Sequence, residues 1–229
     1  MLDKYRRIVA DVIPLFPLSH VLLPGMPLPL HIFEPRYRQL LRDVSADGAL
    51  GAFGVVALRS GSEAGTTAAP DIVGVGTLAE ILEVQPYDDG ASDLLTVGSR
   101  RFRVRRLLPT GTPYARAEID WLPELDGDLH PAHSVVARRL CADLRALLTD
   151  LTGRPRQDEL PDDPNLLSYH LAGQLPLDAA DRQALLAEPT AADRLRRLIA
   201  LLRREVCLVQ STRTIAIAPS VLRLVPHAN

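Results

Sequence analysis

Prolines interrupt an otherwise apolar stretch near the start of the chain, residues 13–44, and this pattern restricts the fold more than any other feature. A proline inside a helix removes a backbone hydrogen bond and collides with the preceding turn, so no helix can pass through the first half of the stretch. Pro24 and Gly25 are the residues of a type II turn, with glycine where φ must be positive. We therefore predict a strand, a turn and a second strand, packed together as a core hairpin.

The segment after this turn changes from strand periodicity to helical periodicity. Residues 28–33 alternate in character, so that odd and even positions should lie on opposite faces of a strand. The expected inward residues are Leu28, Leu30 and Ile32, and the expected outward residues are Pro29, His31 and Phe33. Pro35 suits the first turn of a helix, and apolar residues then repeat at helical spacing up to Val44.

Composition and charge describe a globular chain without a general attraction to polyanions. Of the 229 residues, 47% are hydrophobic and 4% are aromatic, so the chain can bury a mainly aliphatic core. A net charge of −2 argues against nucleic acid or an anionic membrane as a partner. Cys141 and Cys207 form no C-x-x-C pair, which fits a reducing compartment.

The first residues of the chain indicate a strand rather than a signal peptide. Basic residues precede an apolar run, but Asp11 and the prolines interrupt that run, and no small-residue cleavage site follows. No apolar segment is long enough to span a bilayer. We therefore expect a cytoplasmic protein.

The chain has a single lysine, Lys4, and this argues against two kinds of catalytic site. A phosphate-binding P-loop needs lysine in G-x-x-x-x-G-K-[ST], and a Ser-Lys protease needs a lysine beside its serine. Lys4 has neither context. We therefore expect a protein that is not an enzyme, with no catalytic residue and no cofactor.

Two short motifs invite a functional interpretation that their context opposes. Residues 74–79 have the glycine spacing of a dinucleotide fingerprint, but a strand-like segment follows where that motif needs a helix. His130 and His133 are spaced like two ligands on a helix, but a zinc site needs at least three protein ligands. We expect a strand at the first motif and no metal site at the second.

A family resemblance rests on a long and nearly continuous motif. Residues 14–38 read P-L-F-P-L-x-x-V-L-L-P-G-x-x-L-P-L-H-I-F-E-P-R-Y-R, which resembles the opening of the LON substrate-binding domain. That domain is the N-terminal region of the ATP-dependent protease Lon and also occurs as a stand-alone protein, as we expect here. The resemblance continues in V-G-V-G-T-L-A-E-I, T-V-G-S-R-R-F-R-V and Y-A-R-A-E-I-D-W-L, and covers roughly residues 12–122 and 163–209.

The patterns and the resemblance together predict an α+β fold with two domains. About six strands and one helix should form residues 8–124, which the resemblance identifies as a PUA-like β pseudo-barrel. Residues 125–229 should form a C-terminal helical bundle. Asp163, Asp178 and a Thr190-x-x-Asp193 box should cap its later helices.

Two of the predicted helices carry apolar stripes that should face the core of the bundle. The stripe after Pro131 consists of Val136, Leu140, Leu144, Leu147 and Leu151. The stripe of the last helix consists of Leu195, Leu198, Leu202, Val206 and Val209.

The function implied by the resemblance is recognition of unfolded or exposed apolar polypeptide, without catalysis. The chain would then act as a binding protein or an adaptor in protein quality control, together with a separate protease. The alternative is an RNA-binding module that uses the arginine-rich strand 100–106, in which Arg101, Arg103 and Arg105 should share an exposed face. A hydrolase with an unrecognised site is the least favoured interpretation, and the oligomeric state stays open.

The predicted polypeptide-binding site surrounds the first turn. The alternation of residues 28–32 is explained by packing in the core. Met26 and Pro27 follow the turn and should lie at the rim of the sheet, with the ring of Tyr37 partly exposed beside them. Methionine adapts to varied apolar partners, and tyrosine offers contact area with a polar tip. The candidate residues are Leu23, Met26, Pro27 and Tyr37. The opposing interpretation is that all four are buried.

Overall fold

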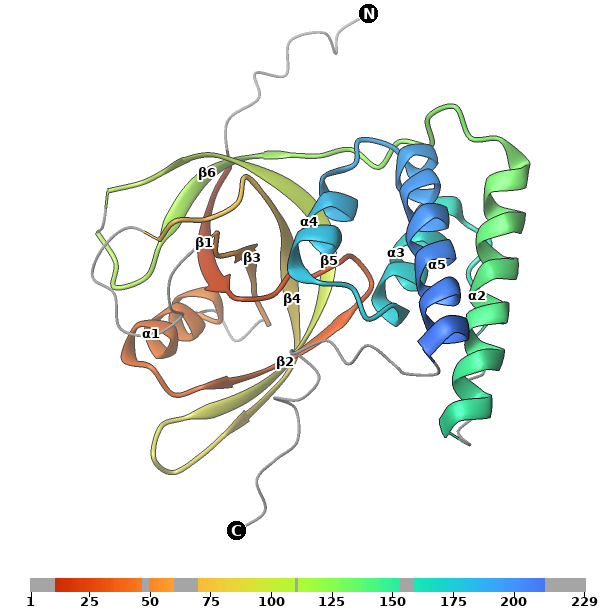
Figure 1. The fold of residues 1–229 in the computed structure, drawn as a ribbon. Coiled ribbons are helices and arrows are strands. Elements are labelled where there is room, and N and C mark those ends of the chain that lie inside the picture. Colours follow the sequence, from red (N-terminus) through yellow and green to blue (C-terminus); the bar gives the residue numbers. More distant parts are fainter. Residues whose placement is uncertain (1–10, 47–49, 60–69, 110, 153–158, 213–229) are drawn as a thin grey trace, which may run out of the picture. The chain divides into compact units, whose positions relative to one another are not determined.

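The computed structural model of the chain describes residues 11–46, 50–59, 70–109, 111–152 and 159–212. These residues divide into two compact units (Figure 1). The β unit runs up to Leu22 and then from Pro27 to Leu122, and the helical unit consists of Leu23–Met26 and the described residues from Pro123 onward. The chain therefore leaves the β unit after Leu122, close to the predicted boundary. We predicted Leu23–Met26 to be part of the β unit, but this segment belongs to the helical unit.

The β unit contains six strands and one helix, in the predicted order. They are β1 (Asp11–Leu18), β2 (Pro27–Ile32), α1 (Pro35–Val44), β3 (Ala52–Ala57), β4 (Val75–Pro86), β5 (Ser92–Leu107) and β6 (Arg116–Trp121). The strand order is β2-β5-β4-β3-β1-β6, and β6 also pairs with β5. This second pairing closes the sheet on itself, as a pseudo-barrel requires.

The predicted hairpin between the first two strands is wrong, although the strands and the turn are present. β1 pairs with β3 and β6, whereas β2 pairs with the first half of β5. Gly25 has a φ of 76°, and the amide of Met26 donates to the carbonyl of Leu23 over 3.2 Å, so the turn forms as expected. The turn therefore redirects the chain between separate positions in the sheet instead of joining neighbours.

Strand β4 replaces the helix that a dinucleotide site would need. Gly76 lies within β4, where an added Cβ would come within 2.4 Å of the carbonyl oxygen of Val55 and 2.7 Å of the ring of Phe102. The glycine therefore allows close packing of backbone and core. The surrounding core includes Leu15, Val56, Phe102, Ala117 and Ile119.

The helical unit contains α2 (Pro131–Thr152), α3 (Pro164–Gln174), α4 (Ala179–Ala187) and α5 (Ala191–Thr212). The predicted caps are confirmed: the carboxylate of Asp163 accepts from the amide of Leu166, and that of Asp178 accepts from the amide of Asp181. Among the residues that the structure describes, no helix combines the length and the apolar composition needed to cross a bilayer.

The two predicted stripes of this unit have different outcomes. On α5, Leu195, Leu198, Leu202 and Val209 are buried, and Val206 is half-buried. On α2, however, the buried face consists of Ala137, Cys141 and Leu144, about a quarter-turn from most of the predicted stripe. The remaining stripe residues, Val136, Leu140, Leu147 and Leu151, are half-buried or exposed. Small side chains of α2 therefore make its closest packing, and larger apolar side chains lie at the border with solvent.

A buried arginine organises the polar interior of the helical unit. The guanidinium of Arg194 is fully buried and stacks 3.9 Å above the ring of Tyr169. It donates to Ser168 Oγ over 2.6 Å and to a carboxylate oxygen of Glu124 over 3.2 Å. The hydroxyl of Tyr169 donates to the same carboxylate over 2.9 Å. The network joins α3, α5 and the segment that enters the unit.

Candidate functional site

The four predicted site residues do not form one exposed patch. Leu23 and Tyr37 are buried, Met26 is half-buried, and only Pro27 is exposed. Leu23 and Met26 belong to the helical unit, whereas Pro27 and Tyr37 belong to the β unit. Within the helical unit, Met26 lies against α3, since a Cβ added to Gly173 would come within 2.5 Å of its Sδ.

Tyr37 is buried because α1 directs its ring toward β1. Its ring stacks on Phe16 with centroids 3.9 Å apart, and Phe16 in turn lies 5.6 Å from Phe53. Aromatic pairs stabilise a core beyond the area that they bury. Tyr37 is therefore a core residue, which corrects the expectation of an exposed ring.

An exposed apolar face lies instead on the outer side of β2, β5 and β4. Residues directly opposite each other in an antiparallel pair share a face, and the outward rows are Pro27–Val97–Glu80, Pro29–Leu95–Glu83 and His31–Asp93–Gln85. Leu95 is 39% exposed, and both prolines are exposed. We call this surface the outer sheet face. It contains Pro27, the one predicted site residue that is exposed.

Aromatic side chains close one end of the outer sheet face. Phe33 is 58% exposed and Tyr87 is 47% exposed, and they flank His31 with ring centroids 5.9 Å and 6.2 Å away. Asp93 accepts from Tyr87 over 2.6 Å and contacts His31 Nδ1 at 2.6 Å. Asp93 therefore joins Tyr87 and His31, and the ring of Phe33 stacks on His31.

The same contacts shift two ionisation equilibria. The hydrogen bond from Tyr87, followed by that from His31, lowers the pKa of Asp93. The carboxylate of Asp93 in turn raises the pKa of Tyr87. Asp93 is therefore held as an anion at the aromatic end, and the Tyr87 hydroxyl stays protonated.

Acidic side chains border the other side of this face. Glu80 and Glu83 are exposed on β4, opposite Val97 and Leu95. The structure assigns neither carboxylate an ion pair with another described residue. An apolar ligand on the outer sheet face would therefore lie beside negative charge.

The free edge of this surface is poorly suited to adding another strand. β2 pairs only with β5 among the described strands, so its other edge is open. A proline cannot donate to a ladder, so the nitrogens of Pro27 and Pro29 must face that open edge. Two donor positions are thereby lost, and contacts between side chains remain as the means of binding.

The arginine-rich strand differs from its predicted arrangement. Arg101 is 1% exposed, because the segment after β1 crosses this face: Thr77, opposite Arg101, donates to the carbonyl of Leu22 over 2.7 Å. Arg105 pairs with Asp120 over 2.5 Å, and a bulge after Val104 changes the facing of Arg106, which pairs with Glu118. These contacts neutralise much of the positive charge that RNA binding would need.

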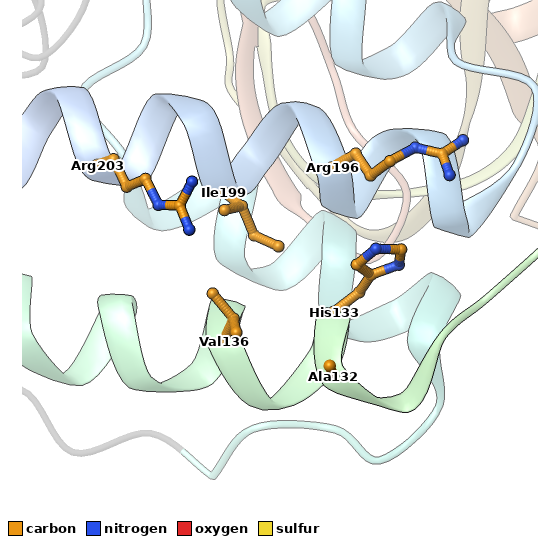
Figure 2. Close-up of a pocket in the computed structure, with 6 residues that line it drawn as sticks. All are labelled: Ala132, His133, Val136, Arg196, Ile199 and Arg203. Atoms are coloured by element: carbon orange, nitrogen blue, oxygen red, sulfur yellow. The ribbon is translucent and has the colours of Figure 1, made fainter.

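The helical unit has a groove between α2 and α5. It has a volume of about 310 Å³ and is lined by Ala132, His133, Val136, Arg196, Ile199 and Arg203 (Figure 2). Within the described ranges, no three His, Cys, Asp or Glu side chains gather closely enough to hold a metal ion. The two histidines noted in the sequence, His130 and His133, have ring centroids 6.1 Å apart.

The sequence contains part of the signal for the outer sheet face. The alternation of residues 28–33 correctly places Pro29, His31 and Phe33 outward. It does not show that Leu95 and Val97 lie beside them, because that depends on the pairing of β2 with β5. Tyr87 falls in a predicted turn, and its contact with His31 also arises from this pairing.

Comparison with known proteins gives the same fold and identifies its family. Residues 12–204 match the family model of the ATP-dependent protease La (LON) substrate-binding domain. A crystal structure of a Lon N-terminal domain protein from Xanthomonas campestris superposes with a TM-score of 0.62 at 32% identity, over 83% of this chain and 98% of that chain. The N-terminal domain of the Mycobacterium avium complex Lon protease shares the fold, with a TM-score of 0.58 at 19% identity, over 84% of this chain and 98% of that chain.

Complete Lon proteases match this chain over only part of their length. Lon protease 2 of Syntrophobacter fumaroxidans is 31% identical over 175 residues, which are 74% of this chain and 21% of that protein. Lon protease of Escherichia coli K12 is 27% identical over 212 residues, or 89% of this chain and 26% of that protein. The chain thus spans about a quarter of the length of these relatives, and it belongs to the LON substrate-binding domain family.

Proposed function

We propose that this chain binds unfolded or exposed apolar segments of other polypeptides and does not itself cleave them. The observation that carries the proposal is the outer sheet face, where Pro29, Leu95, Phe33 and Tyr87 are exposed together. These exposed apolar side chains gather on one face around the His31–Asp93 pair. Exposed apolar side chains that gather on one face mark interaction sites in proteins that otherwise cover such side chains. Membership of a family described as substrate-binding supports a polypeptide as the ligand.

The geometry favours capture of side chains over addition of a strand. Prolines and aromatic rings are rigid, so little conformational entropy is lost when a ligand binds to them. The prolines of β2 also remove donors that an added strand would use. Binding should therefore depend on apolar content more than on backbone register, as recognition of many unfolded sequences requires.

The carboxylates beside the outer sheet face should determine which polypeptide segments bind best. Glu80, Glu83 and Asp93 all lie on the outer sheet face or in its rows. An apolar segment with a flanking arginine or lysine would gain attraction from these carboxylates, whereas an acidic segment would be repelled. We expect selectivity for apolar, basic segments.

The proposed role in the cell is that of a binding component in protein quality control. Lon proteases contain a region similar to this chain within a much longer polypeptide. A chain that binds polypeptide through this region could deliver it to a separate protease as an adaptor. Purified protein should accordingly neither hydrolyse ATP nor degrade casein, as assays of phosphate release and of peptide release would check.

Fluorescence anisotropy with labelled unfolded peptides tests the binding site. One peptide should carry apolar residues with arginines, and a second should have the same apolar residues with glutamates. We expect Phe33→Asp and Leu95→Asp each to weaken binding of the first peptide at least about fivefold, since each places a charge in an apolar contact.

A matched control distinguishes the site from a general effect of added charge. Leu166 is 53% exposed on α3 of the helical unit, and Leu166→Asp should bind as the parent does. Circular dichroism should show that all three variants are folded. The proposal is wrong if Phe33→Asp and Leu95→Asp remain folded and bind both peptides as tightly as the parent.

A further inference from the structure

Two arginines of α5 border the groove of the helical unit, with an apolar residue between them. Arg196, Ile199 and Arg203 follow at i, i+3 and i+7, so they lie along one face of the helix. Figure 2 shows Ile199 between the two arginines, across from Val136 of α2. Seven residues separate the arginines, which places them about 10 Å apart along the helix axis. The groove therefore presents two separate cations with an apolar floor between them.

The α2 side of the groove is also basic. His133 lines the groove, and its Nδ1 is buried without a hydrogen-bond partner among the described residues. Arg139 is exposed and follows Ala132 by seven residues, within about 20° of two full turns, so it lies on the same side of α2 as this lining residue. Asp143, about one turn farther along α2, is the first acidic residue of this row. The basic part of the groove ends there.

These cations are only partly neutralised within the part of the chain that the structure describes. Arg196 contacts Asp193, yet the side chain of Arg196 remains 52% exposed. Arg139 and Arg203 are exposed, and neither forms an ion pair with a described residue. Positive charge beside an apolar floor is therefore available to a ligand.

The segments of this chain outside the described ranges do not complement such a groove. Residues 1–10 and 213–229 each contain more lysine and arginine than aspartate and glutamate. Residues 60–69 contain one acidic residue and only small or polar side chains beside it. The other such segments are short. A ligand that complements the groove should therefore come from another molecule.

The arrangement of cations and floor selects among anionic ligands. An inorganic ion held between the arginines would lie over Ile199 and Val136, whose side chains offer it no hydrogen bond. In an extended strand, side chains that share a face are about 7 or 13 Å apart, whereas helical residues at i and i+7 share a face at about 10 Å. A helix with acidic residues at i and i+7 and apolar residues at i+3 and i+4 therefore matches the groove.

We infer that the groove between α2 and α5 binds an acidic, amphipathic helix of a partner protein. The acidic residues of that helix meet Arg196 and Arg203, and its apolar residues cover Ile199 and Val136, as in other helix-in-groove complexes. A long polyanion such as nucleic acid would meet the carboxylate of Asp143 farther along the groove and be repelled. The inference concerns the helical unit and does not depend on the proposed binding of basic segments to the outer sheet face.

Fluorescence anisotropy of the full chain with a labelled helical peptide tests the inference. The peptide should carry glutamates at i and i+7, leucines at i+3 and i+4 and alanines elsewhere, and a scrambled peptide has the same composition. We expect the designed peptide to bind at least about tenfold more tightly than the scrambled one, with an affinity that falls as salt is raised. Arg203→Glu should weaken binding at least about tenfold, because like charges then meet. Arg103→Glu is a charge-matched control at an exposed position of the β unit and should bind as the parent does.

Exchanging the charges of one contact provides the decisive measurement. Two further peptides each replace one glutamate by arginine, and one of them should bind the R203E variant to within about threefold of the parental affinity, since the ion pair is formed again in reverse. Circular dichroism should show that both variants are folded. The inference is wrong if designed and scrambled peptides bind alike, if Arg203→Glu binds as tightly as the parent, or if neither exchanged peptide restores binding. It is also wrong if an oligonucleotide of equal charge displaces the designed peptide as well as the unlabelled peptide does.

Discussion

Two aromatic clusters of the β unit use similar residues for opposite purposes. The buried cluster consists of Phe16, Tyr37 and Phe53, with the first two rings stacked 3.9 Å apart. The exposed cluster consists of His31, Phe33 and Tyr87, with ring centroids about 6 Å apart. Both draw on residues 11–44, from β1 to α1, yet only one is available to a ligand.

The difference lies in what each ring has opposite to it. Tyr37 projects from α1 onto β1, and the ring of Phe16 fills the space beside it. Phe33 lies between β2 and α1, on the outward side of the strand, and is met only by His31 among the described rings. The type of side chain is therefore a poor guide to function here, and its position on the element decides the role.

Removing a ring from the buried cluster should have the largest effect on stability. Tyr37→Ala removes a fully packed aromatic ring, which typically reduces the free energy of unfolding by about 3–5 kcal/mol. Urea unfolding followed by circular dichroism measures this loss, with Tyr37→Phe as the control that retains the ring. An unchanged midpoint for Tyr37→Ala would show that the two clusters do not differ as described.

A third tyrosine sharpens the comparison, because it uses both its ring and its hydroxyl. Tyr114 is buried, and its hydroxyl donates to Asp43 of α1 over 2.6 Å. Tyr114→Phe should reduce stability by about 1 kcal/mol, the usual net contribution of one hydrogen bond. Urea unfolding at neutral pH checks this value, and a loss as large as that of Tyr37→Ala would contradict it.

The contribution of the Tyr114 hydroxyl should depend on pH in a defined way. Burial, followed by the hydrogen bond to Asp43, raises the pKa of Tyr114 to about 12. In the unfolded chain the tyrosine pKa is near 10, so below pH 10 the protonated hydroxyl makes its full contribution to the free energy of unfolding. This contribution is lost as the pH rises from 10 toward 12, the pKa in the folded protein. The difference in stability between parent and Tyr114→Phe should therefore narrow above pH 10.

Acid should weaken the same hydrogen bond by protonating its acceptor, the carboxylate of Asp43. The hydrogen bond from Tyr114, followed by that from Gln39, lowers the pKa of Asp43. When folding lowers the pKa of a carboxyl group, the ionised group stabilises the protein at pH values above its pKa in the unfolded chain. This stabilisation is lost as the pH falls through the pKa of the folded protein. Asp43→Asn should therefore differ most from the parent near neutral pH and converge with it in acid, as urea unfolding at several pH values would show.

The exposed cluster should give the smallest change in stability. Phe33→Ser alters a side chain that is 58% exposed, so the free energy of unfolding should change by less than about 0.5 kcal/mol. Binding of the apolar, basic peptide should nevertheless weaken. The opposite pattern, with normal binding and a large loss of stability, would make Phe33 a core residue and remove it from the outer sheet face.

Local sequence patterns predicted the elements of this chain well. Alternation placed the residues of β2 on their correct faces, and the Asp163 and Asp178 caps start helices where predicted. These features depend on a few neighbouring residues, so periodicity and capping chemistry are sufficient to find them. The family resemblance supplied the closed sheet, which local patterns alone do not determine.

Features that depend on distant partners could not be predicted in this way. The hairpin was wrong because β2 pairs with β5, more than fifty residues later in the chain. Tyr37 was misplaced because its stacking partner lies on β1, and Arg101 because a loop covers its face of the sheet. The outer sheet face depends on the same long-range pairing, so only Pro27 among the predicted residues belongs to it.

The position of Leu23–Met26 has a consequence for how the chain is made. These residues emerge from the ribosome before α3 does, and Met26 packs against Gly173 of α3, about 150 positions later. At about 5–20 residues per second, the segment waits roughly 7–30 s before its partner has been synthesised. During that interval Leu23 and Met26 lack their native cover, so the nascent chain displays the kind of apolar segment that its finished β unit is proposed to bind.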